Sequence, residues 1–347
     1  MRRALVVLAA SVPVAACQIL AGIDVVSFGR TPDAAEESAD GVTPEDGRTG
    51  DARDGELDAG PVPLSCEGLP RTCGANGDDD CCAADLVPAG TFSRSYDGVF
   101  YTEAGALASV SEFRLDRYEV TVGRLRKFVE AYPGSGPSPK VGTNPSNAAD
   151  PGWQPIWNAE LPKSEAELRT SLACVGTTWT ETPSRNETKP INCVDWYVAF
   201  AFCAWDSGRL PSEAEWNYVA AGGSEHRVYP WSDPADATVI DESYAVYTAA
   251  AAPPGIQLVG SKPKGAGRWG QLDLAGNVAE WTLDWFHGAY DMPCSDCAKT
   301  DGGASRVYRG GSFFDDQGWV RVAKRSSIAP TKGADTRGVR CARAPVP

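Results

Sequence analysis

Residues 209–216 read RLPSEAEW and residues 270–281 read GQLDLAGNVAEW, and these two segments are the most informative about the fold. In the first, Ser212 and Glu215 have the spacing of a capping box, in which each side chain bonds the other residue's backbone amide where a helix starts. The second places an amide, carboxylates and glycines together without a helical or strand period. The sequence therefore predicts a short capped helix and an irregular polar turn.

The remainder of the chain adds few regular elements. Residues 113–121 alternate apolar and polar side chains, as a half-buried strand does. Thr121 has the chemistry to cap a helix that follows it, and a second helix is predicted from Asp195 to near Gly208. With 36 glycines and 26 prolines in 347 residues, the composition favours a loop-rich mixed domain over a helical bundle.

The first residues are organised as an export signal. Two arginines precede an apolar run over residues 4–16, which is too short to span a bilayer as a mature helix. The run ends at Cys17 in a sequence that resembles a bacterial lipoprotein box. We expect residues 1–16 to be a lipoprotein signal peptide and Cys17 to carry the lipid, and the alternative is an ordinary secretory signal. Gln18 favours the outer over the inner membrane within the cell envelope.

An acidic linker is predicted over residues 17–63. It is rich in Asp, Glu, Ala, Gly and Pro, so it cannot bury enough apolar surface to offset the entropy of ordering. Much of the net charge of −14 lies in this stretch. The acidity excludes nucleic acid as a partner, because phosphate binding needs a clustered basic surface. We expect a spacer that holds the domain away from the membrane.

The number of cysteines predicts disulfides in an exported chain. Ten of the 11 remain once Cys17 is set aside, and an even number in an exported protein predicts disulfides. Residues 64–85 form a small cysteine-rich segment in which the adjacent pair is expected to bond the two earlier cysteines, in an order that the sequence leaves open. The four are Cys66, Cys73, Cys81 and Cys82.

A CxxC pair and two histidines are candidates for a chemical site. For Cys294 and Cys297, a local disulfide or a pairing across a loop is favoured over redox chemistry, because no thioredoxin-like strand and helix surround them. His226 and His287 are the only histidines in the chain. Two imidazoles among ten cysteines make a Cys/His zinc cluster an unfavourable interpretation.

Further motifs complete a family resemblance. Together with residues 188–196 (TKPINCVDW), 309–312 (RGGS) and 338–341 (GVRC), the two opening stretches resemble the formylglycine-generating enzyme, or sulfatase-modifying factor, family. The resemblance implies a single loop-rich α/β domain of the α+β kind, related to the C-type-lectin type. We assign it residues 86–347.

The resemblance also implies a structural calcium ion and a disulfide. Oxygen ligands on a bent backbone suit a hard cation, and the alternative is a hydrogen-bonded loop that needs no metal. The disulfide would join Cys203 to Cys341, which leaves Cys174 and Cys193 to pair by elimination. The positions that match the family's calcium ligands are Gly276, Asn277, Val278 and Glu280.

Catalysis in this family depends on two cysteines that follow the RGGS motif and hold copper, with which the enzyme oxidises a cysteine of its substrate. Here Asp315 stands at the first of these positions and Gln317 near the second. Copper(I) prefers soft thiolate ligands, so copper is not expected, and the sequence leaves open whether the chain is an enzyme.

The resemblance also implies a groove for an extended ligand, and the groove does not require the two cysteines. One candidate for its lining, Trp281, suits a buried core equally well. We predict an exported lipoprotein whose domain is a non-catalytic module that binds a peptide or another ligand. The rival interpretations are an active formylglycine-generating oxidoreductase acting on protein cysteine and, from fold analogy alone, a calcium-dependent carbohydrate-binding protein. The candidate groove residues are Trp281, Ser312, Asp315, Asp316, Trp319 and Arg321.

Overall fold

The structure, a computed structural model, describes residues 62–250 and 252–345. The predicted signal peptide over residues 1–16, the lipidated Cys17 and residues 17–61 of the predicted linker lie outside this part of the chain. Within it, no helix has the length and apolar character needed to cross a membrane.

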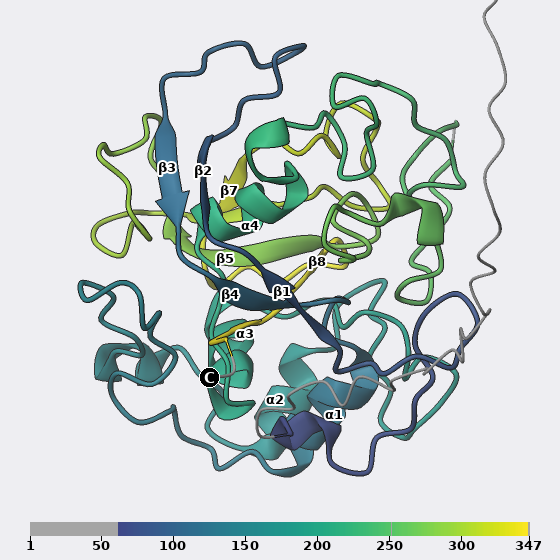
Figure 1. Cartoon of the computed structure of the whole chain (residues 1–347). Coiled ribbons are helices and arrows are strands. Elements are labelled where there is room, and N and C mark those ends of the chain that lie inside the picture. Colours follow the sequence, from purple (N-terminus) through teal and green to yellow (C-terminus); the bar gives the residue numbers. More distant parts are fainter. Residues whose placement is uncertain (1–61, 251, 346–347) are drawn as a thin grey trace, which may run out of the picture. The chain divides into compact units, whose positions relative to one another are not determined.

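Short strands and helices are joined by long loops (Figure 1). The α-helices of the described residues are α1 (Val122–Glu130), α2 (Glu165–Ser171), α3 (Trp196–Trp205) and α4 (Glu213–Ala220). Short 3-10 helices are η1 (Leu64–Cys66), η2 (Pro155–Ala159), η3 (Gly223–Glu225) and η4 (Pro263–Gly265). This is the loop-rich α+β domain that the sequence predicts.

The strands form three small sheets. One is antiparallel, in the order β1 (Ala84–Val87), β4 (Phe113–Asp116), β9 (Ala342–Arg343). The second is the hairpin of β2 (Gly90–Ser93) and β3 (Leu107–Val110). The third has the order β7 (Ser326–Ile328), β6 (Arg306–Arg309), β5 (Ala279–Trp285), β8 (Arg337–Gly338), in which β5 and β8 run parallel.

Helix starts follow the predicted capping chemistry. Thr121 accepts a hydrogen bond from the backbone of α1, and Ser212 and Glu215 form the capping box of α4. Asp195 caps α3 in the same way. In Figure 1, α1, α2 and α3 lie below strands β1 and β4, and α4 lies above them.

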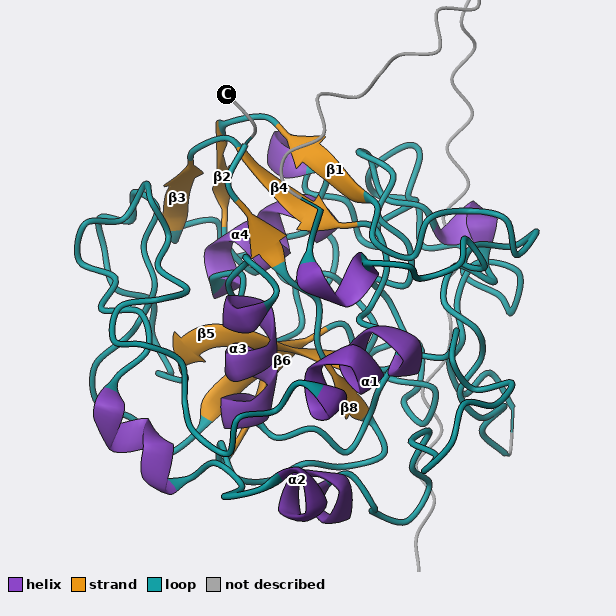
Figure 2. Cartoon of the chain, turned by 90° about the horizontal axis from the view of Figure 1, so that it is seen from below, coloured by secondary structure: helices purple, strands orange, loops and turns teal. Residues whose placement is uncertain are grey.

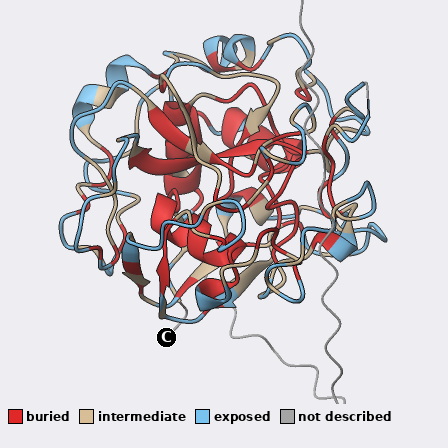
Figure 3. Ribbon diagram, turned by 90° about the horizontal axis from the view of Figure 1, so that it is seen from above, coloured by how far each residue is buried: buried red, intermediate tan, exposed pale blue. Residues whose placement is uncertain are grey.

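Strand β5 lies beside α3 in the interior of the domain (Figure 2) and is buried along nearly its whole length. Figure 3 shows that the buried residues gather in the middle of the domain, with exposed loops around them. On one side of β5, Trp281 packs in the apolar core around α3, and the Trp196 indole donates a hydrogen bond to the carbonyl of Thr282 at 2.8 Å. On the other side the Trp216 indole of α4 donates to the Glu280 carboxylate at 2.7 Å. Both faces of β5 are therefore covered by helices.

Disulfides close the chain at five places within the described residues. The long-range bond joins Cys203 of α3 to Cys341, which is the pairing that the resemblance implies. The adjacent cysteines reach back as expected, and the structure settles the order that the sequence leaves open. The remaining pairs are Cys66–Cys82, Cys73–Cys81, Cys174–Cys193 and Cys294–Cys297.

A buried ion network fixes the cysteine-rich segment to the domain. The Arg124 guanidinium donates to Asp116 at 2.8 Å and to Asp206 at 2.7 Å, and its Nε donates to the Ser65 hydroxyl at 3.0 Å. Arg343 binds the same two carboxylates at 2.9 and 2.8 Å. Because both aspartates are buried and each is shared by two arginines, removing one cation leaves charge uncompensated.

We expect Arg124→Met to lower the free energy of unfolding by about 3 kcal/mol, because it removes one partner from a buried ion network. The control is Arg169→Met, which breaks a half-exposed pair with Glu165 and should cost less than about 1 kcal/mol. Urea unfolding of both variants measures the difference. Equal losses would show that the buried network does not hold the segment.

Candidate functional site

The segment that follows β6 forms a closed turn where the family's cysteines would stand. The Asp315 carboxylate accepts hydrogen bonds from the backbone N–H of Ser312 at 2.9 Å and from its hydroxyl at 2.7 Å. The backbone of Phe313 donates to the Asn277 carbonyl, and the carbonyl of Asp315 accepts from the backbone N–H of Thr248. Ser312 is buried, so it does not line a groove as predicted but supports the turn from beneath.

Exposed aromatic rings and unpaired cations follow on the same segment. Phe314 is 63% exposed and Trp319 is 45% exposed. The Lys324 ammonium lies 4.0 Å from the centre of the Trp319 ring, and the Arg321 guanidinium lies 3.3 Å from that of Phe100. Neither cation forms an ion pair with a described residue. Asp316 is exposed beside them.

Trp281 does not belong to this surface. It is fully buried, and its indole donates a hydrogen bond to the Val194 carbonyl at 3.0 Å. The ring lies edge-on to Tyr308 in the core around α3. The prediction that Trp281 lines a groove is therefore wrong, because β5 carries it between two helices rather than to the surface.

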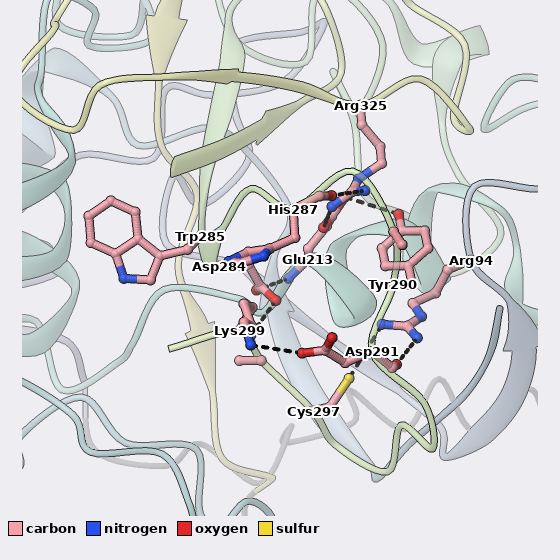
Figure 4. A pocket seen from close by; sticks show the side chains of 12 residues that line it. Arg94, Glu213, Asp284, Trp285, His287, Tyr290, Asp291, Cys297, Lys299 and Arg325 are labelled. Carbon is pink, nitrogen blue, oxygen red and sulfur yellow. Dashed lines mark hydrogen bonds and ion pairs between the residues drawn. The ribbon is translucent and has the colours of Figure 1, made fainter. Parts of the chain in front are cut away.

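A cleft of about 770 Å³ opens beside Lys324. Its walls are the connection between β2 and β3, the loop over residues 286–292, and residues 323–325 that lead into β7. A smaller cavity of about 120 Å³ adjoins it, and both are lined by Arg94, Ala289, Tyr290 and Arg325 (Figure 4). The cleft was not predicted, because these residues lie in loops outside the recognised motifs.

Tyr290 forms the wall between the two cavities. The Arg94 and Arg325 guanidinium carbons lie 4.2 and 4.1 Å from the centre of its ring. Its hydroxyl is within 2.7 Å of the Ser95 hydroxyl and donates to Glu213 at 3.1 Å. Burial raises the pKa of Tyr290 to about 12, so the phenol stays protonated.

Two buried carboxylates face the smaller cavity, and their environments differ. Burial opposes ionisation of Glu213, but the charges of Arg309 and Arg325 outweigh it and hold the pKa of this carboxyl below its usual value. Burial, together with the charge of Glu213, raises the pKa of Asp284 to about 7. Asp284 accepts from the backbone N–H groups of Glu213 at 2.6 Å and Lys299 at 2.8 Å. It therefore ties the start of α4 to the cavity wall.

The expected calcium turn presents no unoccupied side-chain ligands. The Glu280 carboxylate accepts hydrogen bonds from the Arg340 guanidinium at 2.7 Å and from the Trp216 indole. The Asn277 side-chain oxygen accepts from a backbone N–H at 3.1 Å. A guanidinium already neutralises the carboxylate, so these side chains do not fit a calcium ion, and calcium binding stays a prediction from the resemblance.

Glu119 closes the other side of this turn, in which Gly276 and Val278 are buried. Its carboxyl accepts from the Asn277 amide at 2.7 Å and from the Val278 backbone at 3.0 Å. Burial and the nearby charge of Asp273 raise the pKa of Glu119 well above its usual value. This carboxyl is therefore easier to protonate than an exposed glutamate.

The histidines lie apart, and no cluster of three or more metal-ligating side chains occurs in the described residues. His287 Nε2 lies 2.7 Å from the Gly302 carbonyl at the edge of the smaller cavity. His226 Nε2 accepts a hydrogen bond from the backbone N–H of Ser93 at 3.0 Å, where the wall of the cleft begins. Only a neutral imidazole accepts this bond, and burial lowers the pKa of His226 from 6.5.

We expect the stability that His226 supplies to fall as the pH drops. Its folded-state pKa lies below the unfolded value of 6.5, so the unfolded chain takes up the proton first and stability is lost as pH falls through that range. His226→Asn accommodates the left-handed backbone at φ 55°. Urea unfolding at about pH 7.5 and about pH 5.5 should show the wild-type advantage shrinking. An advantage that is equal at both values would contradict this role.

Known proteins with similar sequences belong to the family that the motifs resemble. The family model described as "Sulfatase-modifying factor enzyme 1-like domain" matches residues 74–345. Mouse formylglycine-generating enzyme is 28% identical over 290 residues, which cover 74% of this chain and 73% of the mouse protein. The bovine protein named inactive C-alpha-formylglycine-generating enzyme 2 is 31% identical over 173 residues, 44% of this chain and 50% of the relative.

A solved structure, PvdO from Pseudomonas aeruginosa, superposes with a TM-score of 0.54 at 23% identity and covers 82% of this chain and 100% of that one. It supports the same mixed helix-and-sheet fold. The family match covers most of the chain, and the motifs that carry it build the capped helix α4, the central strand β5 and the turn at Ser312. The chain belongs to the family of sulfatase-modifying factor enzyme 1-like domains.

Proposed function

We propose that this chain is an exported, lipid-anchored member of its family that binds an extended peptide and does not oxidise cysteine. The observation that carries this proposal is the chemistry of the turn after β6. Asp315 and Gln317 stand where the resemblance places the two copper-binding cysteines. All ten cysteines of the described residues are in disulfides, so this part of the chain offers no thiolate pair to copper(I).

Asp315 could not substitute for a thiolate in this arrangement. Its carboxylate is engaged by the backbone and the hydroxyl of Ser312. A carboxylate is also a hard ligand, which copper(I) does not prefer. The side chains present therefore do not fit a copper ion, and the name of the bovine relative shows that inactive members of this family occur.

The surface beside the turn supports peptide binding. Phe314 and Trp319 expose apolar rings, and aromatic side chains supply much of the energy at recognition sites. Lys324 and Arg321 add cations that no described carboxylate neutralises. The adjoining cleft of about 770 Å³ is large enough for several side chains of an extended ligand.

A peptide library displayed on phage, panned against the chain, should yield binders. Trp319→Ala and Phe314→Ala should each weaken the selected peptides about tenfold, because aromatic rings at the centre of an interface carry more than 1 kcal/mol each. Ile156→Ala is the control, since it removes an apolar side chain that is 77% exposed elsewhere. Fluorescence anisotropy gives the affinities. Peptides that bind the two aromatic variants as well as the wild type would overturn the site.

Lipid attachment has a separate test. The apolar run, the small residues before Cys17 and the acidic stretch that follows support it. Cells fed radiolabelled palmitate should label the wild-type chain in the membrane fraction. Cys17→Ser should lose the label, and Cys17→Ser protein that keeps it would contradict the lipid anchor.

A further inference from the structure

The CxxC disulfide lies at the smaller cavity, on a loop that is also held by hydrogen bonds. The backbone N–H of Ser109 in β3 donates to the Cys294 carbonyl, and Asp296 N–H donates back to the Ser109 carbonyl, both at 2.9 Å. The Asp296 carboxylate accepts from the Ser111 backbone at 2.6 Å and from its hydroxyl at 2.8 Å. Four hydrogen bonds therefore hold Cys294 and Asp296 to the strand β3 and to Ser111, in addition to the disulfide.

Cys297 presents its sulfur to the cavity, whereas Cys294 is 6% exposed. The Arg94 guanidinium donates a hydrogen bond from Nη1 to Cys297 Sγ at 3.5 Å (Figure 4). Its other donors go to the carbonyls of Ala106 and Asp291 and to a methionine sulfur, so no carboxylate binds it. The positive charge of Arg94 is therefore directed at the disulfide.

The other charges around the cavity are largely compensated. Lys299 is paired with Asp291 at 2.9 Å and with Asp301 at 3.1 Å. Arg325 is paired with Glu213 at 2.6 Å. Asp284, the remaining carboxylate of the cavity wall, accepts two backbone N–H groups. Arg94 is thus the cation of the cavity lining without an ion-pair partner among the described residues.

We propose that Cys294 and Cys297 form a thiol–disulfide exchange site that accepts two electrons from a peptide or protein dithiol, with Arg94 stabilising the thiolate of Cys297. A cationic neighbour favours the thiolate over the thiol, and thereby favours the reduced pair. Among the five disulfides of the described residues, this one alone has a sulfur bonded by a charged side chain. The proposal does not depend on the peptide-binding function.

The exchange proceeds in two steps. A partner thiolate attacks Cys297 Sγ, a mixed disulfide forms, and Cys294 leaves as a thiolate that takes a proton from water. The second partner thiolate then attacks the partner sulfur of the mixed disulfide, and Cys297 leaves as the thiolate that Arg94 stabilises. Two partner thiols become one disulfide, and the Cys294–Cys297 disulfide becomes two thiols. A small disulfide such as oxidised glutathione restores the starting state by the reverse exchange.

The test equilibrates the full chain in glutathione redox buffers, alkylates the thiols, and measures the reduced fraction of each cysteine pair by peptide mass spectrometry. The Cys294–Cys297 pair should be reduced at least tenfold more readily than Cys203–Cys341, which is a difference of about 30 mV for two electrons. Arg94→Met should make this pair about tenfold harder to reduce, and Arg94→Lys should recover part of the loss. Arg114→Met is the control, because Arg114 also donates to a backbone carbonyl but donates no hydrogen bond to a cysteine sulfur.

A second readout needs no variant and therefore decides the case if Arg94→Met does not fold. In the reduced wild type, the alkylation rate of Cys297 should follow an apparent thiol pKa below the ordinary value of about 8.5. A pair that is reduced no more readily than the other disulfides overturns the proposal, as does a Cys297 thiol with an ordinary pKa. Equal reduction of the wild type and a folded Arg94→Met would remove Arg94 from the site.

Discussion

Buried arginines take over the hydrogen bonding that regular secondary structure performs in other folds. Arg340, which is fully buried, donates to the Glu280 carboxylate and to the carbonyls of Asp116, Arg117 and Leu272. Strands of two to seven residues and long loops leave many carbonyls without a ladder partner, and a buried carbonyl that lacks a donor is costly. The planar guanidinium offers five donors, so one side chain satisfies several loops at once and holds them together.

This arrangement explains how a loop-built site can be rigid. Arg309 donates to the carbonyls of Val322 and Lys324, and Arg94 does the same for Ala106 and Asp291. The walls of the cleft are thus fixed by arginines whose charges then lie beside it. A pre-organised surface of this kind binds at a lower entropic cost than a mobile one. Arg94 has two roles for the same reason, because its guanidinium supports a loop and also faces a disulfide.

The sequence was most informative where local chemistry decides the outcome. The capping box at Ser212 and the cap at Thr121 depend on a few consecutive residues, so the helices that they begin could be predicted, and the fold class followed from the family motifs. Trp281 could not be placed, because both faces of β5 are covered by helices from distant parts of the chain. Arg94 and Tyr290 carry no motif, and only the tertiary structure brings their loops together. The partners of Cys81 and Cys82 depend likewise on how the segment folds back, which spacing alone does not determine.

An assay for cysteine oxidation shows whether the turn after β6 still supports catalysis. The chain would be loaded with copper(I) and incubated in air with a peptide that carries the Cys-x-Pro-x-Arg motif of sulfatases, and mass spectrometry would follow the cysteine. A bona fide formylglycine-generating enzyme, run in parallel, shows that the conditions support turnover. Because Asp315 and Gln317 replace the thiolate pair, we predict that the peptide stays unmodified and that the chain retains no copper. Conversion of the cysteine to formylglycine would show that the chain is an oxidase, and it would require copper ligands other than those at the turn after β6.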